Sequence, residues 1–167
     1  MQDASPNKFL QQLEILIHDE VDFIVVGGVA AVFEGAPIVT LDLDIVYDPS
    51  PANIKRLATA LRKLNAIYRD PAGRRIVPDR SKLGRLKTHL LLTDLGGLDV
   101  LTSIGEQLTY QDLLGRSSHY EVAGIRLRVL DLEAIIESKT FANRDKDRAV
   151  LPILRRTLEL KKQAEAD

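Results

Sequence analysis

The first 35 residues change their hydrophobic pattern once, from helical spacing to a short β-branched run. Behind Ser5-Pro6, apolar residues recur at Phe9, Leu10, Leu13, Leu16 and Ile17. This spacing predicts an amphipathic helix from about Pro6 to Asp19. The run DFIVV at 22–26 then stops at Gly27-Gly28, and VAAVFEG follows it. We therefore expect a strand, a glycine turn and a short helix that ends at Gly35.

The next stretch, LDLDIVYD, alternates strictly and predicts a strand with one face on the core. Its apolar positions are Leu41, Leu43, Ile45 and Tyr47, and between them stand Asp42, Asp44, Val46 and Asp48. Ser50-Pro51 then suits the start of a helix, with Ser50 as N-cap and Pro51 in the first turn. That helix would cover the sheet with Ile54, Leu57, Leu61 and Leu64.

The second half predicts two hairpins followed by two helices. Residues 69–87 are irregular and basic, and we expect mainly loop. Strands at 89–93 and 98–102 flank a glycine-containing turn, and a second pair is expected at 119–122 and 125–129. Helices follow at 131–143 and from 147 to about 161, the latter with Leu151, Leu154 and Leu158 inward and Ile153 as a further candidate. We predict an α+β fold, a mixed sheet flanked by helices, in a single domain spanning 1–167.

Composition narrows the function classes. The 167 residues include 23 basic and 24 acidic residues, for a net charge of −1, so a general nucleic-acid binder is not indicated. Cysteine is absent, which excludes disulfides, thiolate metal sites and thiol nucleophiles. Tryptophan is also absent, and aromatics at 5% argue against base stacking as the main mode of recognition. With no apolar segment of membrane length, we expect a cytoplasmic protein that makes no membrane contact.

Three aspartates stand out by their positions on expected strands. Asp42 and Asp44 are two residues apart, so they would project from one face with Cα atoms about 6.5–7 Å apart. Asp99 lies between Leu98 and Val100 and could join that face. At about 4 Å and an effective dielectric near 20, each like-charged pair costs on the order of 4 kcal/mol, so the cluster needs a proton or a cation. Oxygen ligands favour Mg²⁺ or Mn²⁺ over zinc, although a merely solvated strand face is the alternative interpretation.

The Gly27-Gly28 pair suggests an anion site beside these carboxylates. A strand that ends in two glycines at a helix start exposes unpaired backbone N–H groups and lets a triphosphate approach closely. Simple turn geometry is the alternative for the glycines taken alone.

Taken together, FIVVGGVAAVFEGAPIVTLDLDIVYD resembles the signature of the DNA polymerase β-like nucleotidyltransferase superfamily, with LDVL around Asp99 resembling its later acidic strand. The resemblance covers about 22–150 and is closest to a small prokaryotic branch that includes AbiEii-like toxins and minimal nucleotidyltransferases. Members of that branch often carry a lysine, then an arginine and a Lys-Asp pair, in the C-terminal helices. The segment SKTFANRDKDRA resembles this pattern, with Lys139, Arg144, Lys146 and Asp147. The implied fold is nucleotidyltransferase-like, with a core at about 22–130 and a short C-terminal helical tail at about 131–163.

The resemblance also implies roles. It assigns catalysis and metal binding to Asp42, Asp44 and Asp99, with Mg²⁺ or Mn²⁺ as cofactor and an NTP as substrate. Nucleotide binding would fall to Gly27, Gly28, Thr40 and Lys139. Relatives frequently carry Arg-x-Thr before the paired aspartates, whereas this chain has Ile38 at the arginine position. For Lys139 a solvated helix lysine is the alternative, and for Arg144, Lys146 and Asp147 an exposed interhelix corner.

Several functions are compatible with these features. The leading hypothesis is transfer of a nucleoside monophosphate to a hydroxyl on RNA, protein or a small molecule, with a role in a toxin–antitoxin system. A non-catalytic, antitoxin-like partner protein of the same fold is the main alternative. An aminoglycoside-type transferase is disfavoured, because those relatives usually carry a larger helical domain. The basic stretch 69–87 could follow a tRNA through phosphate contacts or be a solvated loop. The three histidines are isolated and indicate structural or surface roles.

Overall fold

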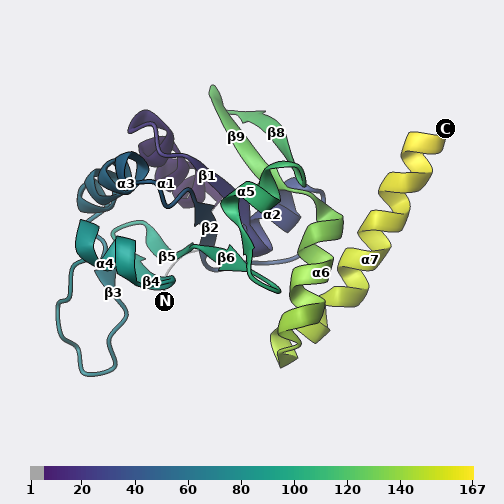
Figure 1. The fold of residues 1–167 in the computed structure, drawn as a ribbon. Coiled ribbons are helices and arrows are strands. Elements are labelled where there is room, and N and C mark those ends of the chain that lie inside the picture. Colours follow the sequence, from purple (N-terminus) through teal and green to yellow (C-terminus); the bar gives the residue numbers. More distant parts are fainter. Residues whose placement is uncertain (1–5) are drawn as a thin grey trace.

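A mixed sheet with helices on both sides forms the protein in the computed structural model, which describes residues 6–167. Figure 1 follows the chain through it. The helices are α1 (Pro6–His18), α2 (Gly27–Phe33), α3 (Pro51–Lys63), α4 (Arg80–Arg85), α5 (Tyr110–Leu114), α6 (Leu132–Ala142) and α7 (Asp145–Ala166). The strands are β1 (Phe23–Val26), β2 (Leu43–Tyr47), β3 (Ile67–Tyr68), β4 (Thr88–Thr93), β5 (Gly96–Leu101), β6 (Ser103–Ile104), β7 (Leu108–Thr109), β8 (Ser117–Val122) and β9 (Ile125–Leu130).

Seven strands make the main sheet, in the order β3-β4-β5-β2-β1-β9-β8. The two hairpins, β4 with β5 and β8 with β9, are antiparallel, as is β1 with β2. The pairs β2 with β5 and β1 with β9 are parallel. The sheet is therefore mixed, and the predicted α+β class with flanking helices is confirmed.

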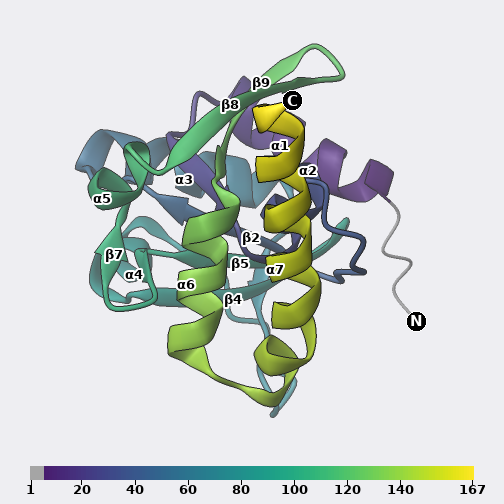
Figure 2. The same cartoon turned by 90° about the vertical axis from the view of Figure 1, so that its right-hand side faces the viewer.

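Apolar side chains from the central strands form the core and are sealed by helices. All four residues of β1 are buried, as are Leu43, Ile45, Val46 and Tyr47 of β2. Figures 1 and 2 show α1 and α3 on one side of the sheet and the antiparallel pair α6 and α7 on the other. The Ser50 hydroxyl accepts from the Asn53 backbone N–H, and Pro51 stands in the first turn of α3, as expected.

Two expectations about the elements need correction, and a third needs an addition. The strand expected from Leu41 begins only at Leu43, and Leu41 itself is 67% exposed, so Asp42 lies in the bend before β2. The basic stretch 69–87 is mainly loop, as expected, and also contains α4, whose first turn is capped by the Asp79 carboxylate. Ile153 is 39% exposed, so it is not a core position of α7.

Other short elements had no clear pattern in the sequence. Strands β3, β6 and β7 have two residues each and α5 has five, which is too short to show a period. His89 has a structural role, because it is buried with its Nδ1 2.7 Å from the Tyr68 hydroxyl. Among the described residues, no helix is long and apolar enough to span a membrane.

Candidate active site

Asp44 and Asp99 are direct neighbours across two parallel strands. The register of β2 with β5 pairs Leu43 with Leu98 and Asp44 with Asp99. Because the neighbours of both aspartates along the strands are apolar and buried, strand alternation turns the two carboxyls toward the same face.

Asp42 approaches this pair from the bend before β2, and Arg69 links it to Asp99. The Arg69 Nη2 atom lies 3.0 Å from Asp99 Oδ1 and 3.5 Å from Asp42 Oδ2. Gly97 of β5 makes room for the contact, since a Cβ there would lie 2.0 Å from Asp42 Oδ1 and 2.6 Å from Arg69 Nη2. The three predicted aspartates therefore gather at one place, together with a basic residue.

The glycine pair lies directly against this cluster. Gly27 has a φ of +65°, and a Cβ there would lie 2.1 Å from Asp44 Oδ2. A Cβ on Gly28 would lie 2.6 Å from the Thr40 hydroxyl oxygen. The Thr40 hydroxyl in turn donates to the Asp42 carbonyl oxygen at 3.3 Å, which ties Thr40 to the bend that carries Asp42. Only glycine lets the start of α2 pack this closely on the acidic cluster.

Burial and like charge make the two central carboxyls hard to ionise together. Burial, then the charge of Asp99 and its hydrogen bond, raise the pKa of Asp44 to about 8. Lys139 acts in the opposite direction. Burial also raises the pKa of Asp99, although Arg69 partly offsets this. At neutral pH the pair therefore holds a proton or requires a cation.

Lys139, Arg144 and Asp147 form a second charged group beside Asp44. Lys139 and Arg144 line a cavity of about 100 Å³ together with Gly27 and Asp44. Asp147 is 0% exposed, accepts a hydrogen bond from Arg144 Nε at 2.7 Å and lies 3.6 Å from Lys139 Nζ. Burial raises the pKa of Asp147, but its bonds with Arg144 and the charge of Lys139 outweigh this and lower it. An ionised Asp147 thus holds two cations at the cavity wall.

The donor set fits a hard divalent cation at Asp44 and Asp99. Both offer carboxylate oxygens, the ligands Mg²⁺ prefers, and Asp99 Oδ1 is buried without a hydrogen-bond partner. Arg69 forms ion pairs with both Asp99 and Asp42. Within residues 6–167, no group of three or more acidic or imidazole side chains is arranged around one point as metal ligands. Asp44 and Asp99 are thus adjacent in register as a metal would need, while Arg69 engages both Asp99 and Asp42.

Arg69 had no distinguishing signal in the sequence, and Asp147 was indicated only by the family resemblance. Arg69 is one of several basic residues between 69 and 87, and only the pairing of β3 with β4 brings it to the site. Asp147 belongs to the charged run RDKDR, which favoured an exposed corner, and for this residue that interpretation is wrong. The packing of α7 against α6 buries it.

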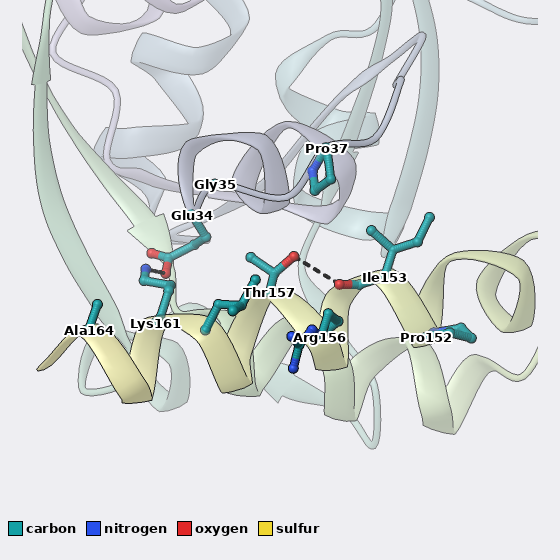
Figure 3. Close-up of a pocket in the computed structure, with 10 residues that line it drawn as sticks. Glu34, Gly35, Pro37, Pro152, Ile153, Arg156, Thr157, Lys161 and Ala164 are labelled. Atoms are coloured by element: carbon teal, nitrogen blue, oxygen red, sulfur yellow. Dashed lines mark hydrogen bonds and ion pairs between the residues drawn. The ribbon is translucent and has the colours of Figure 1, made fainter. Parts of the chain in front are cut away.

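A larger cavity lies away from the acidic cluster. It has a volume of about 660 Å³ and runs between α7 and the segment after α2, where Figure 3 shows Glu34 and Lys161 as an ion pair and the Thr157 hydroxyl bonded to the Ile153 carbonyl. Its lining is mostly apolar and includes no residue of the predicted site. The volume of a cavity therefore does not identify the candidate active site in this protein.

Comparison with solved structures identifies the fold. No protein-family model matches the sequence, and no curated protein matches it. The lincosamide antibiotic adenylyltransferase LnuA, in its lincomycin-bound structure, aligns with a TM-score of 0.64 at 13% identity over 92% of this chain and 98% of its own. ANT(2″)-Ia in complex with adenylyl-2″-tobramycin aligns with a TM-score of 0.60 at 15% identity, over 95% of this chain and 92% of its own.

The fold is thus nucleotidyltransferase-like, as predicted, whereas nothing in the comparisons singles out the AbiEii-like branch. A solution structure of ANT(2″)-Ia gives the same result, with a TM-score of 0.59 at 13% identity over 99% of this chain and 93% of its own. This chain spans almost the full length of both antibiotic-modifying proteins. The expectation that the short helical tail argues against an aminoglycoside-type transferase therefore does not hold for proteins of this size.

Proposed function

We propose that the protein transfers a nucleoside monophosphate from an NTP to a hydroxyl acceptor at the cluster formed by Asp42, Asp44 and Asp99. The observation that carries the proposal is the register of β2 with β5, which sets Asp44 beside Asp99 and against Gly27. A plain solvated strand face would leave these carboxyls apart and exposed. The nucleotidyltransferase-like fold gives independent support.

Each group near the cluster has a physical role in this proposal. Asp44 and Asp99 would hold Mg²⁺ or Mn²⁺, which would neutralise phosphate charge as pyrophosphate leaves. Gly27 and Gly28 are the first residues of α2, where backbone N–H groups lack helical partners and can donate hydrogen bonds to phosphate oxygens. Lys139, held by Asp147, presents its ammonium at the cavity beside Asp44. Thr40 supports the Asp42 bend through its hydroxyl, so its expected contact with phosphate would be secondary.

The small cavity beside Asp44 limits what it can accept. At about 100 Å³ it is well below the roughly 300–1,000 Å³ of pockets that enclose a whole small-molecule ligand. We infer that it accepts a single phosphate group, and that the rest of the NTP and the acceptor lie outside it.

The acceptor is proposed to be a small hydroxyl compound rather than RNA. The two comparison proteins of nearly the same length are named as antibiotic-modifying enzymes or complexes, with lincomycin and adenylyl-2″-tobramycin bound. The basic residues expected to follow a tRNA do not act as one surface, because Arg69 points into the acidic cluster, and Arg74 and Lys82 pair with Asp70 and Asp79. A tRNA or protein acceptor, and a toxin or antitoxin partner, are the alternative outcomes of the test.

The test combines binding and transfer. Calorimetry with each NTP and Mg²⁺ should detect binding, and labelled NTP should pass its monophosphate to a hydroxyl compound in a mixed panel with tRNA and cell proteins. Asp42→Asn and Asp44→Asn should each abolish transfer while the protein still unfolds cooperatively. Transfer that persists in both variants would refute the proposed roles, and NTP binding without transfer to any acceptor would favour the non-catalytic partner protein.

A further inference from the structure

Arg69 is held at the acidic cluster by its position in the fold. It follows β3 directly, and its backbone N–H donates to the Leu90 carbonyl oxygen of β4 at 3.0 Å. Leu90 is the register partner of Asp99 on β5. β4 therefore lies between the backbone of Arg69 and that of Asp99, and the guanidinium extends across β4 to the carboxylates.

The contact is accommodated by a built recess. The Arg69 Nη2 atom lies between Asp99 Oδ1 and Asp42 Oδ2, at 3.0 Å and 3.5 Å. Any side chain at Gly97 would fill this space, because its Cβ would collide with both Asp42 and Arg69. Asp99 Oδ1 is buried, and the guanidinium geometry leaves it without a hydrogen bond. The arginine therefore supplies charge at this oxygen rather than a full hydrogen bond.

Two of the nearby basic residues are paired elsewhere, and Lys146 acts on Asp99 through its charge alone. Lys139 and Arg144 both pair with the buried Asp147. Their charges reach the cluster only at longer range, where they act on Asp44 and Asp99 through space. Arg69 is in direct contact with both Asp42 and Asp99.

We propose that Arg69 and a divalent cation compete for the same carboxylate oxygens of Asp42 and Asp99. The inference rests on the proposed metal site and adds a condition for metal binding: Asp42 becomes a metal ligand only when the guanidinium leaves. Arg69 is 36% exposed at its side chain, so water is available to it on release. Because its backbone is anchored to β4, the guanidinium can move while the sheet stays intact.

The test is Mn²⁺ binding without nucleotide, followed by electron paramagnetic resonance. Arg69→Gln removes the competing charge and should bind Mn²⁺ at least roughly tenfold more tightly than the wild type, because a charge in contact with the ligands acts far more strongly than a screened one. Arg69→Lys keeps a charge but loses the planar fork that can span two carboxylates, and should be intermediate. If Arg69→Gln does not fold, Arg69→Lys replaces it as the test variant.

The matched control is Arg75→Gln, in the same basic loop. Arg75 is exposed, and no ion pair involves it in the part of the chain that the structure describes. This variant loses the same charge without touching the cluster and should bind Mn²⁺ as the wild type does. An equal gain in Arg75→Gln and Arg69→Gln would show a general charge effect and overturn direct competition.

Two further outcomes separate this inference from the proposed function. Unchanged or weaker Mn²⁺ binding in folded Arg69→Gln, with Asp44→Asn still abolishing binding, would overturn the competition and leave the metal site standing. Absence of Mn²⁺ binding in the wild type and both Arg69 variants would remove the metal site and the competition together.

Discussion

Asp44 and Asp99 are direct register partners on the parallel strands β2 and β5, and burial together with the like charge of Asp99 raises the pKa of Asp44. In a folded protein this arrangement is unfavourable for two negative charges. Its consequences can be measured as stability, proton release and tolerance to substitution.

The stability of the metal-free protein should fall as pH rises, because Asp44 titrates late. Its pKa is about 8 in the folded state and 3.8 in the reference state, so the unfolded chain releases this proton first. The stabilisation from the protonated carboxyl is complete below about pH 4 and is lost between pH 4 and 8. Each unit of difference is worth about 1.4 kcal/mol, so the loss should reach a few kcal/mol.

Asp44→Asn is the matched variant for this measurement, since it keeps the shape and removes the titration. In chelator-treated samples, its free energy of unfolding should exceed that of the wild type at pH 8 and approach it at pH 4. Denaturant melts at both pH values check this. Parallel pH curves for the two proteins would contradict the assigned titration.

Divalent-cation binding should be linked to proton release. A cation needs the ionised carboxylate, so Mn²⁺ affinity should rise with pH up to about 8 and level off above it. Below that point the rise should approach tenfold per pH unit for one released proton. Calorimetry in two buffers of different ionisation enthalpy counts the proton directly, and a count of zero would be inconsistent with a protonated Asp44.

Gly27→Ala should damage the site for two reasons. The residue has a φ of +65°, and its new Cβ would lie 2.1 Å from Asp44 Oδ2. We expect transfer to be lost and stability to fall by about 1–3 kcal/mol. Gly35→Ala is the control, because φ is +96° there but nothing lies within 4 Å of the added carbon. It should lose stability through backbone strain while retaining transfer; equal loss of transfer in both would contradict the steric explanation.

Asp147→Ala should be destabilising by about 1.5–3 kcal/mol, because it removes the buried carboxylate that holds Lys139 and Arg144. NTP affinity should fall as well, since Lys139 loses its position beside Asp44. Asp145→Ala removes a carboxylate that is 97% exposed from an ion pair two residues away, and should change stability by at most about 1 kcal/mol. Thermal melts and NTP calorimetry on both variants test the difference.

Much of the fold and part of the site were predictable, because the relevant signals are local. The alternation around Asp44 and around Asp99 marked two strands with an acidic residue flanked by buried apolar ones. The run before Gly27-Gly28 predicted a strand that turns straight into a helix. Apolar spacing also located α1, α3 and both hairpins. Each of these features depends on residues within one turn or one pair of strands.

Strand order and long-range packing decided the rest. Which carboxyl faces Asp44 depends on the register of β2 with β5, formed by segments more than fifty residues apart in the sequence. Arg69 looks like its basic neighbours until β3 pairs with β4, and Asp147 looks solvated until α7 folds back on α6. The alternation of residues along a strand sets the face on which each side chain lies. Which distant groups share that face, and at what cost in charge, is fixed only when the sheet assembles.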